Sequence, residues 1–273
     1  MELLKTEHSD NKGTGKLDKV LIKCDEPDYY KLIEFLYTLH DENAIVPKAS
    51  NYLNTNVVLK FGILQSAEKE FSISNELLEM PNFIRYLCIL KCYNDIKNIL
   101  LNKNTISNYK ICHYGNNQVG ILVMKHYHLG SIENYDWNES NFELLKNVIK
   151  QTIYAVAFAY EKKGFIHGDL HSGNVLLKPK RNPEISYGDR TLIIDELEVC
   201  VMDFEKSKLG QNKMIDLVRG IDKLFTSIIN SNNIKIKIDY SRDKLMQLKT
   251  LTYPDDNFYN VINDIVDKMF IDL

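Results

Sequence analysis

One short segment of the chain combines residue types that can support group-transfer chemistry. It runs from His167 to Asn174 and reads His-Gly-Asp-Leu-His-Ser-Gly-Asn, between a long amphipathic stretch and the apolar residues 175–177. Asp169 offers a carboxylate that can orient a hydroxyl and accept its proton, and Asn174 offers an amide oxygen for a metal ion. These are groups that the transfer of a phosphoryl group to a hydroxyl requires.

This segment resembles the catalytic loop of the protein-kinase superfamily, which reads His-x-Asp-x-x-x-x-Asn and is followed by an apolar strand. Residues 169–177, Asp-Leu-His-Ser-Gly-Asn-Val-Leu-Leu, are also similar to the loop of haspin-type kinases, which carry an insert where this chain has residues 178–197. The resemblance implies phosphoryl transfer from ATP, with Mg²⁺ or Mn²⁺ as the metal, to Ser or Thr hydroxyls of a protein. Asp169 would be the catalytic carboxylate and Asn174 a metal ligand.

A second metal ligand is expected at Asp203, which ends an apolar strand. Asp195 also ends an apolar stretch and lies closer to Asn174 in the sequence, but only Asp203 is followed by an aromatic residue, Phe204. We therefore expect Asp203 to bind the metal together with Asn174. His167 and Phe204 would pack in the interior as supports of the loop.

A lysine that holds the α- and β-phosphates is expected at Lys60, which ends the apolar run 57–59. Such a lysine needs a carboxylate partner from the next helix, for which Glu70 and Glu76 are available. On a helical wheel Glu70 lies near the middle of the apolar face, whereas Glu76 lies roughly 100° away from it. A carboxylate on a buried face needs a partner, so we expect Glu70 to pair with Lys60.

The kinase resemblance also implies an adenine site, because residues 122–131 resemble the strand-to-hinge passage of kinases. His126 and His128 have no acidic or cysteine neighbour, which favours a solvated hinge surface over a metal site. The residues expected to bind the nucleotide are Val58, Lys60, Met124, Lys125, His126, Tyr127 and Leu176.

Several positions depart from the kinase pattern. Residues 49–56 contain no glycine, although kinases cover the triphosphate with a glycine-rich loop shortly before the lysine strand. Gly168 stands where many kinases have the arginine that binds a phosphorylated activation loop, so that mode of switching is not expected. His171 replaces the lysine of typical Ser/Thr kinases, and it could contact the transferred phosphate, contact Asp169 or make only a structural hydrogen bond.

The segment that follows Asp203 is short and lacks an Ala-Pro-Glu motif, so we expect the peptide-docking region to be absent or reduced. Glu205 occupies the usual place of a glycine, which argues against a large flip of Asp203. In the helix that begins at Met214, either Asp216 or Asp222 could anchor the catalytic loop, and each could equally be a solvated helix carboxylate.

The pattern of apolar residues predicts an α+β, bilobal protein-kinase-like fold, with a small mixed β lobe containing one main helix and a larger, mainly helical lobe. Helices are predicted at 28–40, 67–80, 95–101, 142–162 and from 214, and strands at 56–63, 83–92, 120–124, 175–177 and 199–202. The chain would divide into a polar N-terminal arm (1–27), an N-lobe (28–124), a hinge (125–130) and a C-lobe (131–273).

Composition excludes some classes of protein. The 273 residues carry a formal charge of −3, which argues against nucleic-acid binding by the whole surface. The five cysteines follow no disulfide or zinc spacing, and this favours a reducing compartment. The polar first residues are no secretory signal and no apolar run is long enough to span a membrane, so we expect a soluble intracellular protein that needs no oligomerisation.

The sequence is also consistent with two other functions. His-Gly-Asp loops with a short following segment also resemble aminoglycoside phosphotransferases and related sugar kinases, which indicates a small-molecule kinase. The missing glycine-rich loop indicates a pseudokinase that binds partners through the fold. The short, Lys-, Asn- and Ile-rich chain also looks like the kinase-like proteins of large DNA viruses.

Overall fold

The computed structural model describes residues 48–52, 55–91, 113–114, 117–231, 233–234 and 238–269. The helices predicted at 28–40 and 95–101, and the polar arm predicted at 1–27, lie outside these residues. None of the helices in the described part of the chain is long and apolar enough to cross a membrane.

The described residues form two compact units. The first contains the residues up to Ser72 and those from Arg85 to His126, and the second contains Ile73–Ile84 and the residues from Tyr127 onward. The boundary after His126 falls inside the segment predicted as a hinge, whereas Ile73–Ile84 groups with the second unit although it was expected in the N-lobe.

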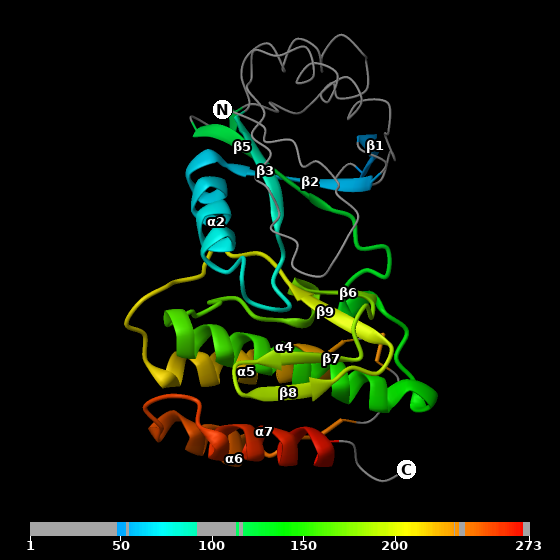
Figure 1. The fold of residues 1–273 in the computed structure, drawn as a ribbon, viewed down its shortest axis with the longest axis vertical. Coiled ribbons are helices and arrows are strands. Elements are labelled where there is room, and N and C mark those ends of the chain that lie inside the picture. Colours follow the sequence, from blue (N-terminus) through cyan, green and yellow to red (C-terminus); the bar gives the residue numbers. More distant parts are fainter. Residues whose placement is uncertain are drawn as a thin grey trace. The chain divides into compact units, whose positions relative to one another are not determined.

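The first unit is built on an antiparallel sheet with the strand order β1-β2-β5-β3 (Figure 1). Its strands are β1 (Lys48–Tyr52), β2 (Thr55–Ile63), β3 (Tyr86–Lys91), β4 (His113–Tyr114), which pairs with β5, and β5 (Asn117–Lys125). The three strands predicted in this region are confirmed. In β5 the consecutive residues Ile121, Leu122, Val123 and Met124 are all buried, so side chains on both faces of this strand are covered.

Helix α2 (Leu64–Glu76) follows β2 without a loop and packs on the sheet. Its buried positions recur every three to four residues and are Ala67, Glu70, Ile73 and Ser74. The helix approaches β5 closely at Gly120, where an added Cβ would lie 2.8 Å from Cβ of Ala67. The sequence predicted a helix to Met80, but the helix ends at Glu76 and the last residues before Pro81 form turns, with the Met80 amide bonded to the Leu77 carbonyl at 3.0 Å.

The second unit is organised around helix α4 (Phe142–Lys163), close to the predicted 142–162. In Figure 1 this helix lies between the strand pair β6–β9 and the C-terminal helices. The other elements are β6 (Val175–Pro179), β7 (Glu184–Tyr187), β8 (Arg190–Ile193), β9 (Leu197–Val201), α5 (Met214–Ile229), α6 (Arg242–Gln247) and α7 (Asp256–Lys268). Short 3-10 helices cover Ile132–Asn134, Glu139–Asn141, Ser172–Asn174 and Leu248–Thr250. The predicted α+β organisation, a small mixed β unit with one helix and a larger helical unit, is therefore confirmed.

The insert predicted at 178–197 contains a β-hairpin that the sequence analysis did not predict. Strands β7 and β8 pair antiparallel, with Tyr187 opposite Arg190 across the two residues Gly188 and Asp189. Gly188 has φ +67°, a conformation that a two-residue hairpin turn needs and that glycine adopts without steric cost. The ring of Tyr187 is fully buried, so the hairpin is part of the core of the second unit.

The hairpin is tied to the segment Ile73–Ile84 through Asn82, a buried residue with φ +65°. The Asn82 side chain accepts a hydrogen bond from the Tyr187 hydroxyl at 2.5 Å and donates to the Val199 carbonyl at 2.9 Å. The backbone carbonyl of Asn82 accepts from the amide of Val201 at 2.7 Å. One residue thus connects the turn after α2 to the hairpin and to β9.

Replacing Tyr187 with Phe should lower the free energy of unfolding by about 1–3 kcal/mol, because the Asn82 side-chain oxygen would stay buried without its donor. Urea unfolding followed by circular dichroism measures the difference. Tyr253→Phe is the matched control, since Tyr253 is an exposed tyrosine. Equal loss in the two variants would contradict the structural role of the Tyr187 hydroxyl.

Candidate active site

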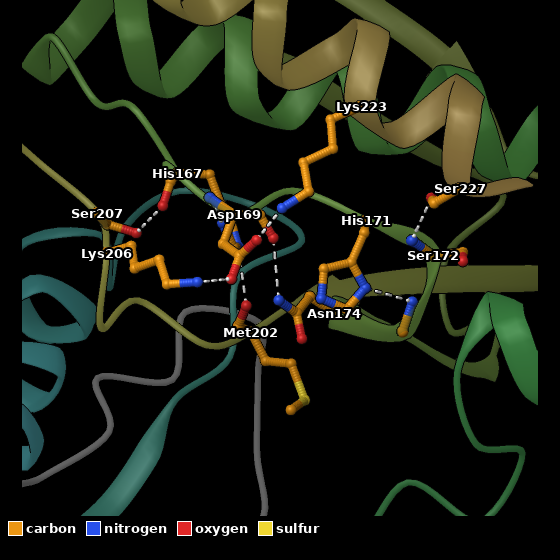
Figure 2. Close-up of polar contacts among 11 residues, drawn as sticks. His167, Asp169, His171, Ser172, Asn174, Met202, Lys206, Ser207, Lys223 and Ser227 are labelled. Carbon is orange, nitrogen blue, oxygen red and sulfur yellow. Dashed lines mark hydrogen bonds and ion pairs between the residues drawn. The ribbon is translucent and has the colours of Figure 1, made fainter.

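The predicted catalytic loop connects α4 to β6 in the second unit, and a buried histidine organises it (Figure 2). The His167 Nε2 lies 2.8 Å from the Met202 carbonyl, and its Nδ1 accepts a hydrogen bond from the Asp169 amide at 3.3 Å. These partners require a neutral ring that carries its proton on Nε2. Burial lowers the pKa of His167 to about 4 and so favours this form.

Phe204 supports the loop from the interior, as the sequence predicted. Its ring is fully buried and lies 5.9 Å from the ring of His167 and 5.9 Å from that of Phe165. Edge-to-face aromatic contacts of this kind are favourable beyond the apolar area that they bury. His167 and Phe204 therefore hold the loop and the segment after β9 in one packed cluster.

The Asp169 carboxylate lies between two lysine ammonium groups. Lys206 Nζ is 2.5 Å from Oδ2, and Lys223 Nζ donates to Oδ1 (Figure 2). Partial burial would raise the pKa of Asp169, but the hydrogen bonds and charges of Lys206 and Lys223 outweigh it and lower the pKa to about 2. The carboxylate is consequently ionised at neutral pH and can accept hydrogen bonds.

Asn174 and Asp203 are brought next to each other by backbone contacts. The Asn174 side-chain NH2 group donates to the Asp169 carbonyl at 3.0 Å. The side-chain oxygen of Asn174 therefore points away from that carbonyl. The Met202 amide donates to the Asn174 carbonyl at 3.0 Å, so Asp203 follows directly beside the loop. Asp195, the alternative ligand, is an exposed residue between β8 and β9. Unlike Asp195, Asp203 directly follows a residue that binds the loop.

The two side chains fit a magnesium ion by their chemistry. An amide oxygen and a carboxylate are hard oxygen donors, and Mg²⁺ in nucleotide sites is held by one or two such groups with the phosphates and waters. Asp203 has φ +68°, a conformation that non-glycine residues rarely adopt and that is found at constrained functional positions. No group of three His, Cys, Asp or Glu side chains that could form a separate metal centre occurs in the described ranges.

His171 makes a structural hydrogen bond, one of the roles left open by the sequence. Its Nδ1 accepts the Gly173 amide at 3.1 Å and caps the 3-10 helix Ser172–Asn174. An Nδ1 that accepts cannot carry a proton, so in this arrangement His171 supplies no positive charge through that atom.

Helix α5 anchors the loop from one face. The Ser172 amide donates to the Ser227 hydroxyl at 2.8 Å, and Lys223, one helical turn earlier, contacts Asp169. The two aspartates proposed as anchors from the sequence pair elsewhere. Asp216 lies 3.7 Å from Arg219, and the buried Asp222 binds Arg242 at 2.7 Å and the Tyr240 hydroxyl. Ser227 takes the anchoring position instead of an aspartate.

The short segment after Asp203 runs back along the start of the loop. Ile166 and Lys208 exchange two backbone hydrogen bonds of 2.9 and 2.8 Å, and the Ser207 hydroxyl donates to the His167 carbonyl at 2.8 Å. Gly168, with φ +76°, allows this approach, since an added Cβ would lie 2.3 Å from the Lys206 carbonyl oxygen. An arginine could not occupy position 168 in this arrangement. The backbone pairing of Ile166 with Lys208 and the hydroxyl of Ser207 therefore hold the segment against the loop.

In the first unit, Lys60 and Glu70 form the predicted ion pair, at 2.7 Å. The Glu70 side chain is only 2% exposed and also accepts a hydrogen bond from the Tyr86 hydroxyl. Glu76, the alternative partner, is 54% exposed and pairs with Lys163. The helical-wheel argument therefore identified the correct glutamate.

The residues predicted to bind adenine lie in both units. In the first, Val58 and the buried Met124 are opposite each other in the β2–β5 pair, followed by the exposed Lys125 and the half-buried His126. In the second, Leu176 pairs with Cys200 across β6–β9, and the Cys200 thiol donates to the Tyr127 hydroxyl at 3.2 Å. Burial, with the neighbouring Cys200, raises the pKa of Tyr127, so its hydroxyl stays protonated.

Of the glycine-free stretch 49–56, residues 49–52 belong to β1 and residues 55–56 begin β2. Strands β1 and β2 pair antiparallel from Lys48 opposite Val58 to Tyr52 opposite Thr55, with an irregularity between Ala49 and Tyr52. The strand that carries Lys60 is therefore paired with the strand before it, and the stretch contains no glycine.

Sequence reasoning missed Lys206, Lys223, Ser227, Asn82 and Tyr187. Three of these contact the catalytic loop from distant positions, and no local pattern marks them. Lys223 and Ser227 do share an i, i+4 spacing on one face of α5, but this spacing alone does not reveal what the face contacts. The hairpin that carries Tyr187 had a usable signal, the Gly-Asp pair between two alternating segments.

Comparison with known proteins gives partial similarities. No protein-family profile matches the chain. Over 110 residues, 34% of this chain, it is 33% identical to a probable serine/threonine-protein kinase of Dictyostelium discoideum, and the match spans 9% of that protein. Over 79 residues, 28% of this chain, it is 30% identical to an uncharacterized protein of Caenorhabditis elegans, of which the match spans 27%.

Among solved structures, the crystal structure of the yeast RNA Pol II CTD kinase CTDK-1 complex aligns with a TM-score of 0.39 at 12% identity, over 63% of this chain and 46% of that chain. The sequence similarity to the Dictyostelium kinase agrees with the kinase-like loop.

Gly168→Ala should destabilise the protein by about 1–3 kcal/mol, because alanine is strained at φ +76° and its Cβ would meet the Lys206 carbonyl. Gly220→Ala is the control. Gly220 lies inside α5 with nothing within 4 Å of an added Cβ, and alanine there should stabilise by about 0.5–1 kcal/mol. Melting temperatures of the two variants test this, and a stable Gly168→Ala protein would refute the close approach.

The buried neutral His167 should make stability depend on pH. Its pKa of about 4 lies below the ordinary 6.5, so the unfolded chain binds a proton that the folded protein refuses. The free energy of unfolding should fall as the pH is lowered from about 6.5 to about 4 and change no further below that through this group. Urea unfolding at several pH values should show a smaller slope in His167→Gln than in wild type; equal slopes would contradict this assignment.

Proposed function

We propose that this protein is an ATP- and Mg²⁺-dependent kinase that transfers a phosphoryl group to Ser or Thr hydroxyls of a protein. One observation carries the proposal. In the second unit, the Asn174 side-chain amide donates to the backbone carbonyl of the ionised Asp169, and the amide of Met202, next to Asp203, donates to the Asn174 carbonyl. A proton acceptor next to two oxygen ligands is the arrangement that phosphoryl transfer to a hydroxyl needs.

Each residue has a distinct task in this proposal. Asp169 orients the acceptor hydroxyl and accepts its proton, and its two lysine contacts keep it ionised for that purpose. Asn174 and Asp203 would hold the metal ion, which supplies charge neutralisation at the phosphates when bound. Lys60, fixed by the buried Glu70, would bind the α- and β-phosphates.

The adenine would be bound by the remaining predicted residues, namely Val58, Met124, Lys125, His126, Tyr127 and Leu176. Met124 is buried and Val58 half-buried at neighbouring positions of one sheet, which provides an apolar surface for a base. Tyr127, whose hydroxyl accepts a hydrogen bond from the Cys200 thiol, belongs to the second unit.

The enzyme would need no activating phosphate on the segment after Asp203. The backbone pairing of Ile166 with Lys208 and the contact of Ser207 with His167 already fix that segment. A kinase whose corresponding segment is disordered gains order through new contacts between arginine and phosphate. Gly168 offers no such arginine.

Two other functions are supported by particular features. The short segment between Asp203 and α5 leaves little chain for docking a peptide, which supports a small hydroxylated molecule as acceptor. The glycine-free β1–β2 pair supports a binding module without transfer activity, because phosphates cannot approach its backbone as closely as they approach glycine.

Mg²⁺-ATP should raise the melting temperature of the protein, since a ligand that binds only the folded state stabilises it. Asp203→Asn should remove the Mg²⁺-dependent part of that shift. Asp169→Asn should keep the shift and lower phosphoryl transfer from labelled ATP by about 10²–10⁴-fold.

Asp195→Asn is the control and should behave as wild type in both assays, because Asp195 is exposed between β8 and β9. Protein and small hydroxylated acceptors are tested side by side. Transfer only to small acceptors would replace the protein-kinase assignment, and a thermal shift without transfer would leave the binding module. Absence of both refutes the proposal.

A further inference from the structure

The two lysines at Asp169 come from outside the catalytic loop and point to a function of their own. Resting on the kinase function proposed above, we propose that Lys206 and Lys223 are positioning residues that together replace the missing loop lysine. They fix the Asp169 carboxylate and offset its charge, so that an anionic phosphoryl group and the acceptor hydroxyl can meet beside it.

The chemistry requires such a cation. Asp169 is ionised, and the transferred phosphoryl group carries negative charge on its oxygens, so the two repel each other in a weakly screened site. The loop itself, residues 167–174, contains no lysine or arginine. Here the Nδ1 of His171 accepts the Gly173 amide and carries no proton. The positive charge at Asp169 is provided by other residues.

The contacts define the direction of the carboxylate. Lys206 Nζ lies 2.5 Å from Oδ2, and Lys223 Nζ donates to Oδ1, so each oxygen has its own ammonium group (Figure 2). Contacts at both oxygens fix the plane of the carboxylate as well as its position.

Both lysines stand on backbone that is itself attached to the loop. Lys206 precedes Ser207, whose hydroxyl binds the His167 carbonyl at 2.8 Å. Lys223 lies one turn before Ser227, which receives the Ser172 amide at 2.8 Å. The backbone positions from which the two lysines reach Asp169 are therefore held by short, local connections.

Stability alone does not account for these contacts. The side chains of Lys206 and Lys223 are 64% and 51% exposed, and ion pairs with exposed lysines contribute little to folding. Two long side chains that lose rotamer freedom at one carboxylate are better explained by a requirement of the site than by one of the fold.

The test compares Lys206→Met, Lys223→Met and the double variant with wild type, using ATP and a Ser/Thr protein that the wild type phosphorylates. We expect kcat to fall by about 10-fold in each single variant and by about 10²-fold or more in the double variant. The KM for ATP should stay within about twofold, because these lysines act at the acceptor side. Arginine at both positions should restore most of the activity, since it keeps the charge.

Two controls separate this effect from folding and from the general loss of a lysine. Lys213→Met removes an exposed lysine of the segment between Asp203 and α5 and should leave kcat unchanged, and melting temperatures of all variants should match. In an Asp169→Asn background, the lysine substitutions should have little further effect, because they act through Asp169.

A double variant with wild-type or higher kcat overturns the inference while the kinase function stands. A loss of kcat that is equally large in the Asp169→Asn background also overturns it, since the lysines would then act independently of Asp169. A wild type that transfers no phosphate to any acceptor refutes the kinase function and this inference together.

Discussion

The candidate site depends on one buried, neutral imidazole. His167 has a single donor and a single acceptor, and the structure uses both, one toward the Met202 carbonyl and one toward the Asp169 amide. Because the ring is buried, its protonation is unfavourable. Only the neutral ring with its proton on Nε2 satisfies both hydrogen bonds. The His167 side chain therefore binds both the end of the strand before Asp203 and the loop that carries Asp169.

Around this imidazole, the site is assembled mostly from backbone contacts. The Met202 amide binds the Asn174 carbonyl, Ser227 receives the Ser172 amide, and Lys208 pairs with Ile166. Backbone groups cannot move without disturbing the elements that carry them, so the reactive side chains inherit the rigidity of α4, α5 and β9. Asp169 is the exception, because its carboxylate is positioned by the side chains of Lys206 and Lys223.

Local sequence patterns predicted the structure correctly wherever it depends on a single helix, strand or loop. Helix periodicity placed Glu70 on the buried face, and the apolar patterns on either side of the loop correctly placed Asp169 and Asn174 between a helix and a strand. The pattern failed where the partner comes from a distant part of the chain. Lys206, Lys223 and Ser227 are ordinary surface residue types, and nothing near them in the sequence indicates a contact with the loop. The boundaries of α2 also failed, because the turns before Pro81 end the helix earlier than apolar periodicity suggests.

The close approach of α2 to β5 sets a dimension of the first unit. At Gly120 the space for a side chain is already filled by Ala67, so the separation between helix and strand is fixed by a residue with no side chain at all. Glu70 stands on the same buried face one turn further along α2, and Lys60 is on the strand next to β5. The distance between α2 and the sheet therefore keeps Glu70 close enough to Lys60 for their 2.7 Å ion pair. A larger residue at position 120 that moves α2 away from the sheet would therefore weaken the Lys60–Glu70 pair without contacting Lys60.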